Sequence, residues 1–254
     1  MSPFVPMKKK VIVVMPAYNA ELTLERTVLD IPPGLADEII VVDDSSKDKT
    51  VEIAERLGLT VIRHAKNKGY GGNQKTCYDT ALAHGADIVI MIHPDYQYDS
   101  RLASFIIGFI EKGVCDVMLG SRVRTRRECL SSGMPIYKYI ANRILTMIEN
   151  MVLGLCLTEY HTGYRAYSRA VLEKIDYHKN SDNFTFDAQM LIQVVYFGFN
   201  IGEVPVPCRY FKEASSINFW NSSLYGLGIL KTLAQFLLQK WGIAKFTIFE
   251  PQKQ

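Results

Sequence analysis

Short apolar runs alternate with segments of helical periodicity over roughly the first half of the chain. The apolar runs, which are typical of buried strands, are Val11–Met15, Glu38–Val42, Thr60–Arg63, Ile88–Ile92 and Val117–Leu119. The segments between them that carry apolar residues at helical spacing are Glu21–Leu29, Lys49–Leu57, Asn73–His84 and Leu102–Glu111. This alternation predicts an α/β fold in which a mostly parallel central sheet has helices on both faces.

The pattern changes after residue 122. Two further helices are predicted, one at Pro135–Leu157 with an end or bend near Gly154, and one at Phe186–Phe197. Ile201–Val206 has the composition of a strand. Because it contains Pro205, which cannot donate to a strand ladder, we expect it at an edge of the sheet.

The closing segment, Leu224–Trp241, is predicted to be a C-terminal amphipathic helix with a wide apolar face. Its polar positions, Lys231, Gln235 and Gln239, recur every four residues and form a narrow stripe. Such a helix either packs against the domain or lies in a membrane interface. The Pro135–Leu157 stretch is rich in aromatic residues and methionine, which suits an acyl chain or a contact between two copies of the chain.

Composition narrows the function classes. The chain has 254 residues, of which 48% are hydrophobic and 22% charged, as in a folded globular protein. A net charge of +3 gives no reason to expect nucleic-acid binding. The 5 cysteines form no C-x-x-C pair, which favours reduced thiols in the cytoplasm over a zinc site or a disulfide framework. No run of about 18 consecutive apolar residues occurs, so no membrane span is predicted.

Polar side chains gather where the predicted strands end. The segments Pro16–Asn19, Asp43–Ser46 and His93–Gln97 each follow an apolar strand, and a glycine-rich loop, Asn67–Asn73, leads into a helix. Ligands of open α/β sheets bind at the carboxyl ends of the strands, and a helix N-terminus favours anions. We therefore expect these segments to meet at one ligand.

In this order the motifs resemble those of the family 2 glycosyltransferases with the GT-A fold, close to the dolichyl-phosphate mannose synthases and polyprenyl-phosphate glycosyltransferases. The matching segments are Pro16–Asn19, Val42–Thr50, Asn67–Gly71, Asp95–Asp99, Gly120–Arg122, Thr162–Tyr167, Phe186–Gln189 and Glu203–Val206. The resemblance implies an inverting transfer of a hexose from a GDP- or UDP-sugar to polyprenyl or dolichyl phosphate. It divides the chain into a domain at 1–217, with a nucleotide-sugar half at about 10–122 and an acceptor half at about 123–217, and a helical extension at 218–254.

The resemblance also implies a donor site. Asp44, with Asp43 beside it, is expected to bind the base or the ribose of the donor, because a carboxylate accepts hydrogen bonds from N–H and O–H groups. The other donor-site residues, which line the pocket or flank the nucleotide, are Pro16, Tyr18, Asn19, Lys68 and Gly69. We expect Asp44 to be a surface carboxylate whose removal leaves the fold intact.

A divalent cation, Mn²⁺ or Mg²⁺, is implied as cofactor, and its site departs from the family pattern. The family usually has Asp-x-Asp after the fourth strand, whereas this chain has His93-Pro94-Asp95. Asp95, Gln97 and His93 are the predicted ligands, and an imidazole suits Mn²⁺ better than Mg²⁺. The alternative for His93 is a hydrogen bond to a neighbouring loop. The cation stabilises the charge of the departing nucleoside diphosphate, as arginine side chains do.

The acceptor decides which residues are catalytic. A lipid phosphate is already ionised and needs cations, for which Arg122 and Arg165 lie in matched motifs. Arg124, Arg126 and Arg127 stand in a predicted loop, where a solvated position is the default. A sugar hydroxyl instead needs a general base, for which the candidates are Asp187 and Glu159. The predicted catalytic residues are therefore Asp95, Asp187, Arg122 and Arg165.

Two other functions compete with this prediction. The same fold can transfer sugar to a saccharide in cell-wall or capsule synthesis, and the lost carboxylate of the metal motif favours a nucleotide-sugar-binding module with weak catalysis. A dinucleotide-dependent dehydrogenase is excluded, because no G-x-G-x-x-G follows the first strand. The expected partners are a nucleotide-sugar, a lipid phosphate, a membrane surface on its cytoplasmic face and a second copy of the chain.

Overall fold

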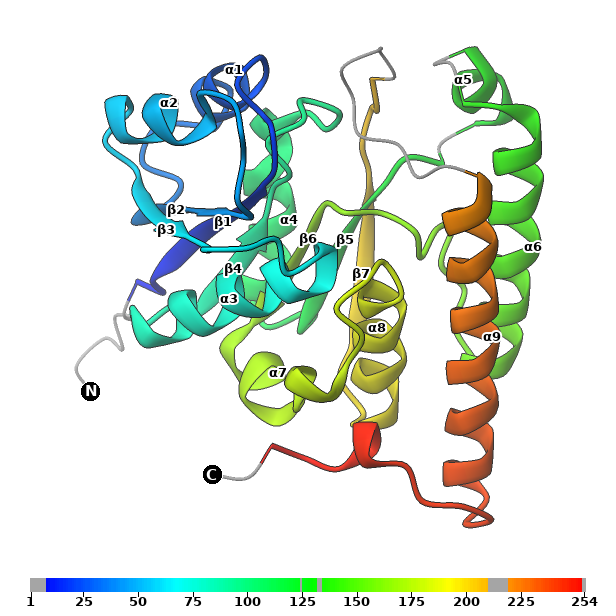
Figure 1. Cartoon of the computed structure of the whole chain (residues 1–254). Helices are drawn as coiled ribbons and strands as arrows, with labels where there is room; N and C mark the ends of the chain where they lie inside the picture. Colours follow the sequence, from blue (N-terminus) through cyan, green and yellow to red (C-terminus); the bar gives the residue numbers. More distant parts are fainter. Residues whose placement is uncertain (1–7, 124, 132–133, 210–218, 253–254) are drawn as a thin grey trace, which may run out of the picture.

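The computed structural model describes residues 8–123, 125–131, 134–209 and 219–252. Within these residues, seven strands form one sheet in the order β3-β2-β1-β4-β6-β5-β7 (Figure 1). Their bounds are β1 Val11–Ala17, β2 Glu38–Asp43, β3 Thr60–Arg63, β4 Ile88–Met91, β5 Val117–Ser121, β6 Arg165–Ser168 and β7 Ile201–Pro205. Only β6 runs antiparallel to its neighbours, so the predicted mostly parallel sheet is confirmed. Strand β7 lies at an edge, as its proline predicted.

Helices cover both faces of the sheet (Figure 1). The helices are α1 Leu24–Leu29, α2 Thr50–Arg56, α3 Tyr70–Ala83, α4 Ala103–Glu111, α5 Arg126–Ser131, α6 Ile136–Leu153, α7 Arg169–Lys174, α8 Phe186–Tyr196 and α9 Phe219–Lys240. Alternate residues of β1 enter two separate cores, since side chains of a strand point to opposite faces in turn. Val11 and Val13 pack with α1, α2 and α4, whereas Ile12 and Val14 pack with α3, α7 and α8.

Glycines define the end of α6 and the start of α3, and only the first of these was predicted. Gly154 ends α6 in the left-handed conformation, with φ of +74°, as predicted. Helix α3 begins at Tyr70, earlier than predicted, because Gly69 with φ of +85° already turns the chain into it. The arginine-rich segment was predicted as a loop, but Arg126–Ser131 is helix α5; Arg124 lies outside the described residues.

Helices α6 and α9 stand side by side at the edge of the molecule (Figure 1). Ile229, Leu233 and Phe236 of α9 are buried in the core that includes α8. Leu224 and Leu227 of the same helix are 50% and 64% exposed. One side of α9 therefore packs against the domain while another leaves leucines uncovered. The domain boundary expected at 217 falls outside the described residues, and no helix within them is long and apolar enough to cross a membrane.

Candidate active site

A cavity of about 960 Å³ opens at the carboxyl ends of β1, β2 and β4 and extends between α6 and α9. It is lined by most of the residues predicted from the sequence, namely Pro16, Tyr18, Asn19, Asp44, Gly69, His93, Asp95, Gln97, Arg122 and Asp187. The remaining three, Asp43, Lys68 and Arg165, lie outside its lining. The structure thus brings the separate sequence motifs together around one cavity.

Each of the three polar strand ends holds a non-glycine residue in the left-handed region. These are Asn19 after β1, Ser45 after β2 and Tyr96 after β4, with φ of 51°, 68° and 57°, and they are the only such residues in the described part of the chain. Residues other than glycine adopt this backbone conformation at some energetic cost. The strain is concentrated at the edge of the sheet that faces the cavity, which is where binding sites commonly hold it.

The loops after β1 and β2 are fastened to each other by side-chain hydrogen bonds. The backbone N–H of Asn19 donates to Ser46 Oγ at 2.8 Å, and the N–H of Lys47 donates to Asn19 Oδ1 at 2.9 Å. Asp43 is buried and accepts from the N–H of Ser46. Tyr18, by contrast, is 54% exposed and lines the cavity. Its ring is therefore the part of this region that is open to a flat ligand.

Asp44 is a buried residue, and the prediction of a surface carboxylate was wrong. The residue is 3% exposed, and its carboxylate accepts from the backbone N–H groups of Lys68 and Gly69, at 2.8 Å and 3.1 Å. His64 Nδ1 lies 2.7 Å from Asp44 Oδ1. Asp44 thus holds the Lys68–Gly69 loop against β2. A Cβ at Gly69 would lie 2.7 Å from the carbonyl oxygen of Asp182, so this loop position requires glycine.

His93 and Asp95 line the cavity from the loop after β4. Burial lowers the pKa of His93, which keeps the imidazole neutral, and raises the pKa of Asp95 above its usual range. The hydroxyl of Tyr70 lies 3.3 Å from His93 Nε2 and donates to Asp187 Oδ2 at 2.8 Å. Since Tyr70 has one proton, its oxygen accepts from His93 Nε2–H, which leaves the lone pair on Nδ1.

These residues fit a divalent cation only as part of its coordination shell. No three His, Cys, Asp or Glu residues within the described ranges are grouped so that they could hold a metal ion by themselves. A neutral imidazole and a buried carboxylate nonetheless supply two ligand types that Mn²⁺ accepts, and a cation would offset the burial of Asp95. The phosphates of a donor and water would complete the shell, since such ions keep several non-protein ligands.

Arg165 and Asp187 form a buried pair beside the cavity. Arg165 has no exposed surface, and its guanidinium donates to the carbonyl oxygens of Thr162 and Asp187. Its Nη2 lies 3.5 Å from Asp187 Oδ2, while Gln74 Nε2 donates to Asp187 Oδ1 at 3.0 Å. The predicted contact of Arg165 with phosphate does not fit this placement. Arg165 instead fixes Asp187 from behind.

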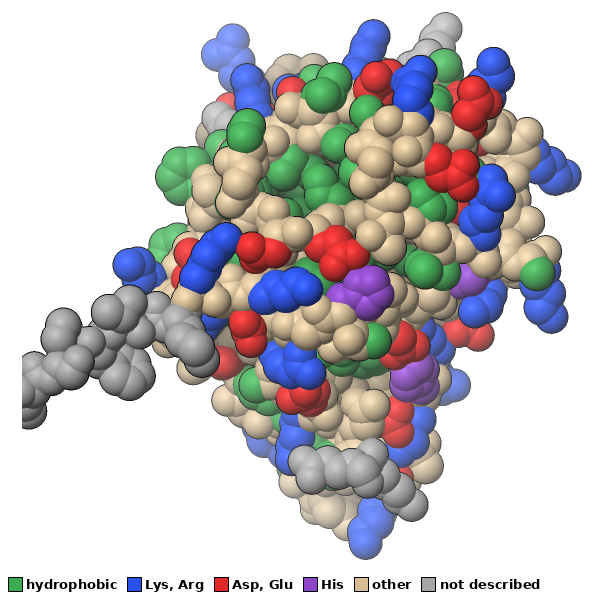
Figure 2. Space-filling view, turned by 90° about the vertical axis from the view of Figure 1, so that its left-hand side faces the viewer, with side chains coloured by type: hydrophobic (Ala, Val, Ile, Leu, Met, Phe, Trp, Pro, Cys, Tyr) green, Lys and Arg blue, Asp and Glu red, His purple; other side chains and the backbone are tan. Residues whose placement is uncertain are grey.

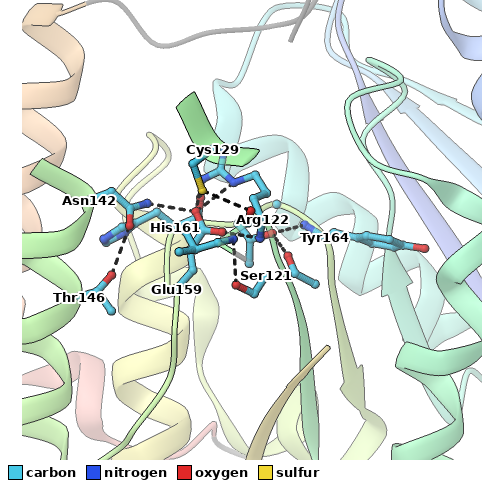
Figure 3. A network of polar contacts seen from close by, with 12 residues as sticks. Ser121, Arg122, Cys129, Asn142, Thr146, Glu159, His161 and Tyr164 are labelled. Carbon is cyan, nitrogen blue, oxygen red and sulfur yellow. Dashed lines mark hydrogen bonds and ion pairs between the residues drawn. The ribbon is translucent and has the colours of Figure 1, made fainter. Parts of the chain in front are cut away.

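Arg122 lies at the centre of a polar network with Glu159 (Figure 3). Its backbone N–H donates to Glu159 at 2.8 Å and its Nε donates at 2.9 Å, while Nη2 contacts both Glu159 and the carbonyl of His161. Asn142 Nδ2 donates to the same carboxylate at 3.0 Å. Burial raises the pKa of Glu159, but the positive charge and hydrogen bonds of Arg122 outweigh this effect and hold the pKa below its usual range. Glu159 is therefore the partner of Arg122, and its candidacy as a base does not fit the structure.

Sequence reasoning missed several residues that line the cavity: Tyr70, Lys138, Asn142, His161 and Tyr225. Tyr70 stands inside the glycine-rich motif and His161 directly precedes a matched motif, so both carried a signal. Lys138, Asn142 and Tyr225 come from the two amphipathic helices, whose sequences show no fixed motif. Their place at the cavity follows only from how α6 and α9 pack.

Comparison with known proteins agrees with this geometry. The profile of Glycosyl transferase family 2 matches residues 12–176. An uncharacterised protein of Methanocaldococcus jannaschii is 31% identical over 82% of this chain and 85% of its own length. A UDP-N-acetylglucosamine–dolichyl-phosphate N-acetylglucosaminyltransferase of Methanococcus voltae is 28% identical over 80% of this chain and 86% of its own.

Among solved structures, glucosyl-3-phosphoglycerate synthase from Mycobacterium tuberculosis, in complex with UDP, superimposes with a TM-score of 0.69 at 20% identity. The alignment covers 97% of this chain and 87% of the synthase, which shows that the chain has the expected GT-A fold. The family match, the relatives and the shared fold lead to one conclusion: this chain belongs to glycosyl transferase family 2 and is a glycosyltransferase.

Proposed function

We propose that the enzyme transfers a hexose from a nucleoside-diphosphate sugar to a polyprenyl phosphate, with inversion at the sugar carbon. One observation carries this proposal: a single cavity has polar strand-end loops on one side and apolar helix walls on the other, with cationic side chains between them. The name of the Methanococcus voltae relative, a transferase acting on dolichyl phosphate, supports the same acceptor class.

The donor occupies the strand-end side. Tyr18 offers an exposed ring to the base, and Gly69 lets the loop beside the nucleotide pass close to the backbone of Asp182. Asp44 acts on the donor through the Lys68–Gly69 loop that it holds, because its oxygens already accept three contacts. The donor pocket is therefore shaped by a loop that a buried carboxylate keeps in place.

The diphosphate lies next to Asp95, His93 and Gln97, which would hold the cation together with the donor's own oxygens. When bound, the cation stabilises the negative charge that develops on the leaving diphosphate. His93 offers Nδ1 as a neutral ligand, since its Nε2–H is directed to Tyr70. Asp95 offers a carboxylate whose charge burial disfavours until a cation approaches.

The acceptor phosphate occupies the cationic region between the two ends. Arg122 is held in one orientation by Glu159, and Lys138 of α6 lines the same part of the cavity. Asp187 already accepts hydrogen bonds at both oxygens, from Gln74 and Tyr70. An engaged Asp187 and a buried Glu159 make poor bases. This favours an acceptor that is already ionised over a sugar hydroxyl.

The lipid chain follows the apolar wall of the cavity. This wall includes Ile144 and Leu145 of α6 and Leu227 and Leu230 of α9. The same two helices expose further large apolar side chains, namely Ile136, Tyr137, Ile140, Met147, Met151 and Leu224. We propose that these exposed residues rest on a membrane surface, from which the polyprenyl chain enters the cavity.

A donor screen tests the function. The protein is incubated with GDP- and UDP-sugars, polyprenyl phosphate in detergent and either Mn²⁺ or Mg²⁺, and lipid-linked sugar is measured after extraction. We expect one donor to be used, with activity lost in a chelator and restored by the cation. Binding of a nucleotide-sugar without transfer to any acceptor would instead indicate a binding module.

A further inference from the structure

Glu149 of α6 is a buried carboxyl group that the proposed reaction does not use. It has no exposed surface, and neither of its oxygens receives a hydrogen bond within the described residues. His161 lies beside it: the imidazole Nε2 is 3.3 Å from Glu149 Oε2 and likewise receives no hydrogen bond within the described residues. On the far side of the imidazole, Nδ1 lies 2.9 Å from the hydroxyl of Tyr225 on α9. The three side chains form a polar chain from inside α6 to α9.

Burial determines which of the three side chains carry protons. It raises the pKa of Glu149 to about 8 and lowers the pKa of His161 to about 4. At neutral pH the carboxyl group therefore keeps its proton, and the imidazole is neutral. Glu149 then donates towards His161 Nε2, so Nδ1 carries the ring proton and donates to the oxygen of Tyr225. Burial also raises the pKa of Tyr225, which keeps its own proton.

Tyr225 and His161 line the cavity together with Arg122, in the region assigned to the acceptor phosphate. Because the oxygen of Tyr225 accepts from His161, its own proton is directed to another partner. We propose that Glu149, acting through His161, is a positioning residue that makes Tyr225 a hydrogen-bond donor to the phosphate of the lipid acceptor, a role that rests on the proposed function.

The hydrogen bonds among these three side chains reverse direction when Glu149 loses its proton. The carboxylate then accepts from His161 Nε2–H, Nδ1 becomes an acceptor, and Tyr225 donates to it. Tyr225 would present only lone pairs to an anionic phosphate in this state. Acceptor binding should therefore weaken as the pH rises through the pKa of Glu149.

Other ionisable groups also face these three side chains. Those acting on Glu149, His161 and Tyr225 from neighbouring elements are Arg165, Tyr160, Glu159, Arg122, Arg143 and Asp187. None is of a type that ordinarily titrates between about pH 7 and about pH 9. A change within that interval is therefore assigned to Glu149.

Steady-state kinetics test whether Glu149 acts on Tyr225 through His161. Polyprenyl phosphate is varied at saturating donor across this pH interval, and KM and kcat are measured separately. For the wild-type enzyme we expect the acceptor KM to rise about tenfold with little change in kcat or donor KM, the scale of one hydrogen bond to a charged group. Glu149→Gln keeps a neutral donor and cannot titrate, so its acceptor KM should stay constant. Tyr225→Phe should have a raised acceptor KM at every pH.

NMR of histidine labelled with ¹⁵N reads the tautomer of His161 in the full chain without any acceptor. The signal is identified among the 5 histidines by its loss in His161→Gln. We expect Nδ1–H below about pH 8 and Nε2–H above it in the wild type, and a single tautomer in Glu149→Gln. A tautomer that does not change with pH overturns the coupling of Glu149 to Tyr225 through His161. An acceptor KM unaffected by Tyr225→Phe overturns the role of Tyr225 at the phosphate.

If no lipid phosphate accepts sugar, the proposed function falls, and the role of Tyr225 at the phosphate falls with it. The tautomer measurement uses no acceptor, so it still shows whether the coupling itself exists.

Discussion

At the donor end of the cavity the polar side chains come from short loops after β1, β2 and β4, whereas at the acceptor end they come from α6, α9 and the segment before β6. The donor loops are held by hydrogen bonds to neighbouring backbone, as Asp44 holds Lys68 and Gly69. The acceptor end is held by buried charged pairs that link distant parts of the chain, as Glu159 holds Arg122. The first arrangement joins a side chain to backbone N–H groups, and the second joins two charged side chains.

The surfaces of the two ends differ as well. The face of the molecule on the side of α1, α2 and α3 carries acidic and basic side chains intermixed (Figure 2). On α6 and α9, Ile136, Met147, Met151 and Leu227 are each more than half exposed. We proposed above that the first end binds a soluble donor and the second an apolar partner. Four changes test this division.

The largest effect is expected at the charged pair of the acceptor end. Arg122→Ala leaves Glu159 buried without its cation, which should lower the free energy of unfolding by about 3–5 kcal/mol. The measurement is urea unfolding near neutral pH, with Arg127→Ala, an exposed arginine of α5, as the matched control. An Arg122→Ala protein as stable as the control would show that the pair does not organise this end.

The same pair predicts a pH dependence. Arg122 holds the folded-state pKa of Glu159 below its ordinary value of 4.5, so the stabilisation is present above that pH and is lost as the pH falls through the folded-state pKa. The stability difference between wild type and Arg122→Ala should therefore shrink below about pH 4.5. A difference that is constant down to strongly acidic pH would contradict the assignment.

The second effect concerns the cation. Asp95→Asn keeps the shape of the side chain and removes its charge, so turnover should fall at least about 100-fold, the scale of one lost electrostatic contact at a reacting group. Glu111→Gln, an exposed carboxylate at the end of α4, serves as control and should retain wild-type turnover. Unimpaired turnover in Asp95→Asn, or in the presence of a chelator, would remove the cation from the mechanism.

The third effect shows whether Asp44 shapes the donor pocket through the Lys68–Gly69 loop or contacts the nucleotide directly. Asp44→Asn disturbs hydrogen bonds from the Lys68–Gly69 loop, so we expect a loss of about 2 kcal/mol in stability together with weaker donor binding. Chemical unfolding and calorimetry with the nucleoside diphosphate measure the two quantities. If donor binding weakened at unchanged stability, Asp44 would be a direct ligand of the nucleotide.

The smallest effect is expected at the apolar face. Leu227→Gln removes one exposed leucine of α9, which should weaken binding to lipid vesicles about fivefold with little change in folding stability. Leu22→Gln is the matched control, because Leu22 near α1 is 67% exposed, similar to Leu227 at 64%. Equal vesicle binding by both variants would contradict the membrane assignment, and a change in oligomeric state in Leu227→Gln would assign this face to a second copy.

The sequence predicted the donor end better than the acceptor end for a physical reason. Strands β1 and β4 are continuous apolar runs, and β2 contains one between Glu38 and Asp43, so their polar ends are read directly from adjacent residues. Burial was misjudged at Asp44, because its partners Lys68 and Gly69 lie more than twenty residues further along the chain. A strand end alone does not reveal which loop will cover it.

At the acceptor end, the role of each charge depends on contacts between distant elements. Arg165 was predicted to bind phosphate, yet its strand, β6, lies between β4 and β5 and buries the guanidinium. β6 itself escaped prediction because it is four residues long and begins with a charged residue. Tyr225 and Lys138 carry no motif, and they reach the cavity only because α6 and α9 pack side by side.

The central claim is that the polar and the apolar ends of the cavity serve two chemically different substrates in one reaction. The most direct test compares initial rates of sugar transfer from the preferred donor to three acceptors: a polyprenyl phosphate, the polyprenol of the same length, and a soluble saccharide. The account predicts transfer to the polyprenyl phosphate and none above background to the other two, because the acceptor must supply both an ionised nucleophile and an apolar chain. Transfer to the saccharide, or equal rates with polyprenol and its phosphate, would contradict it.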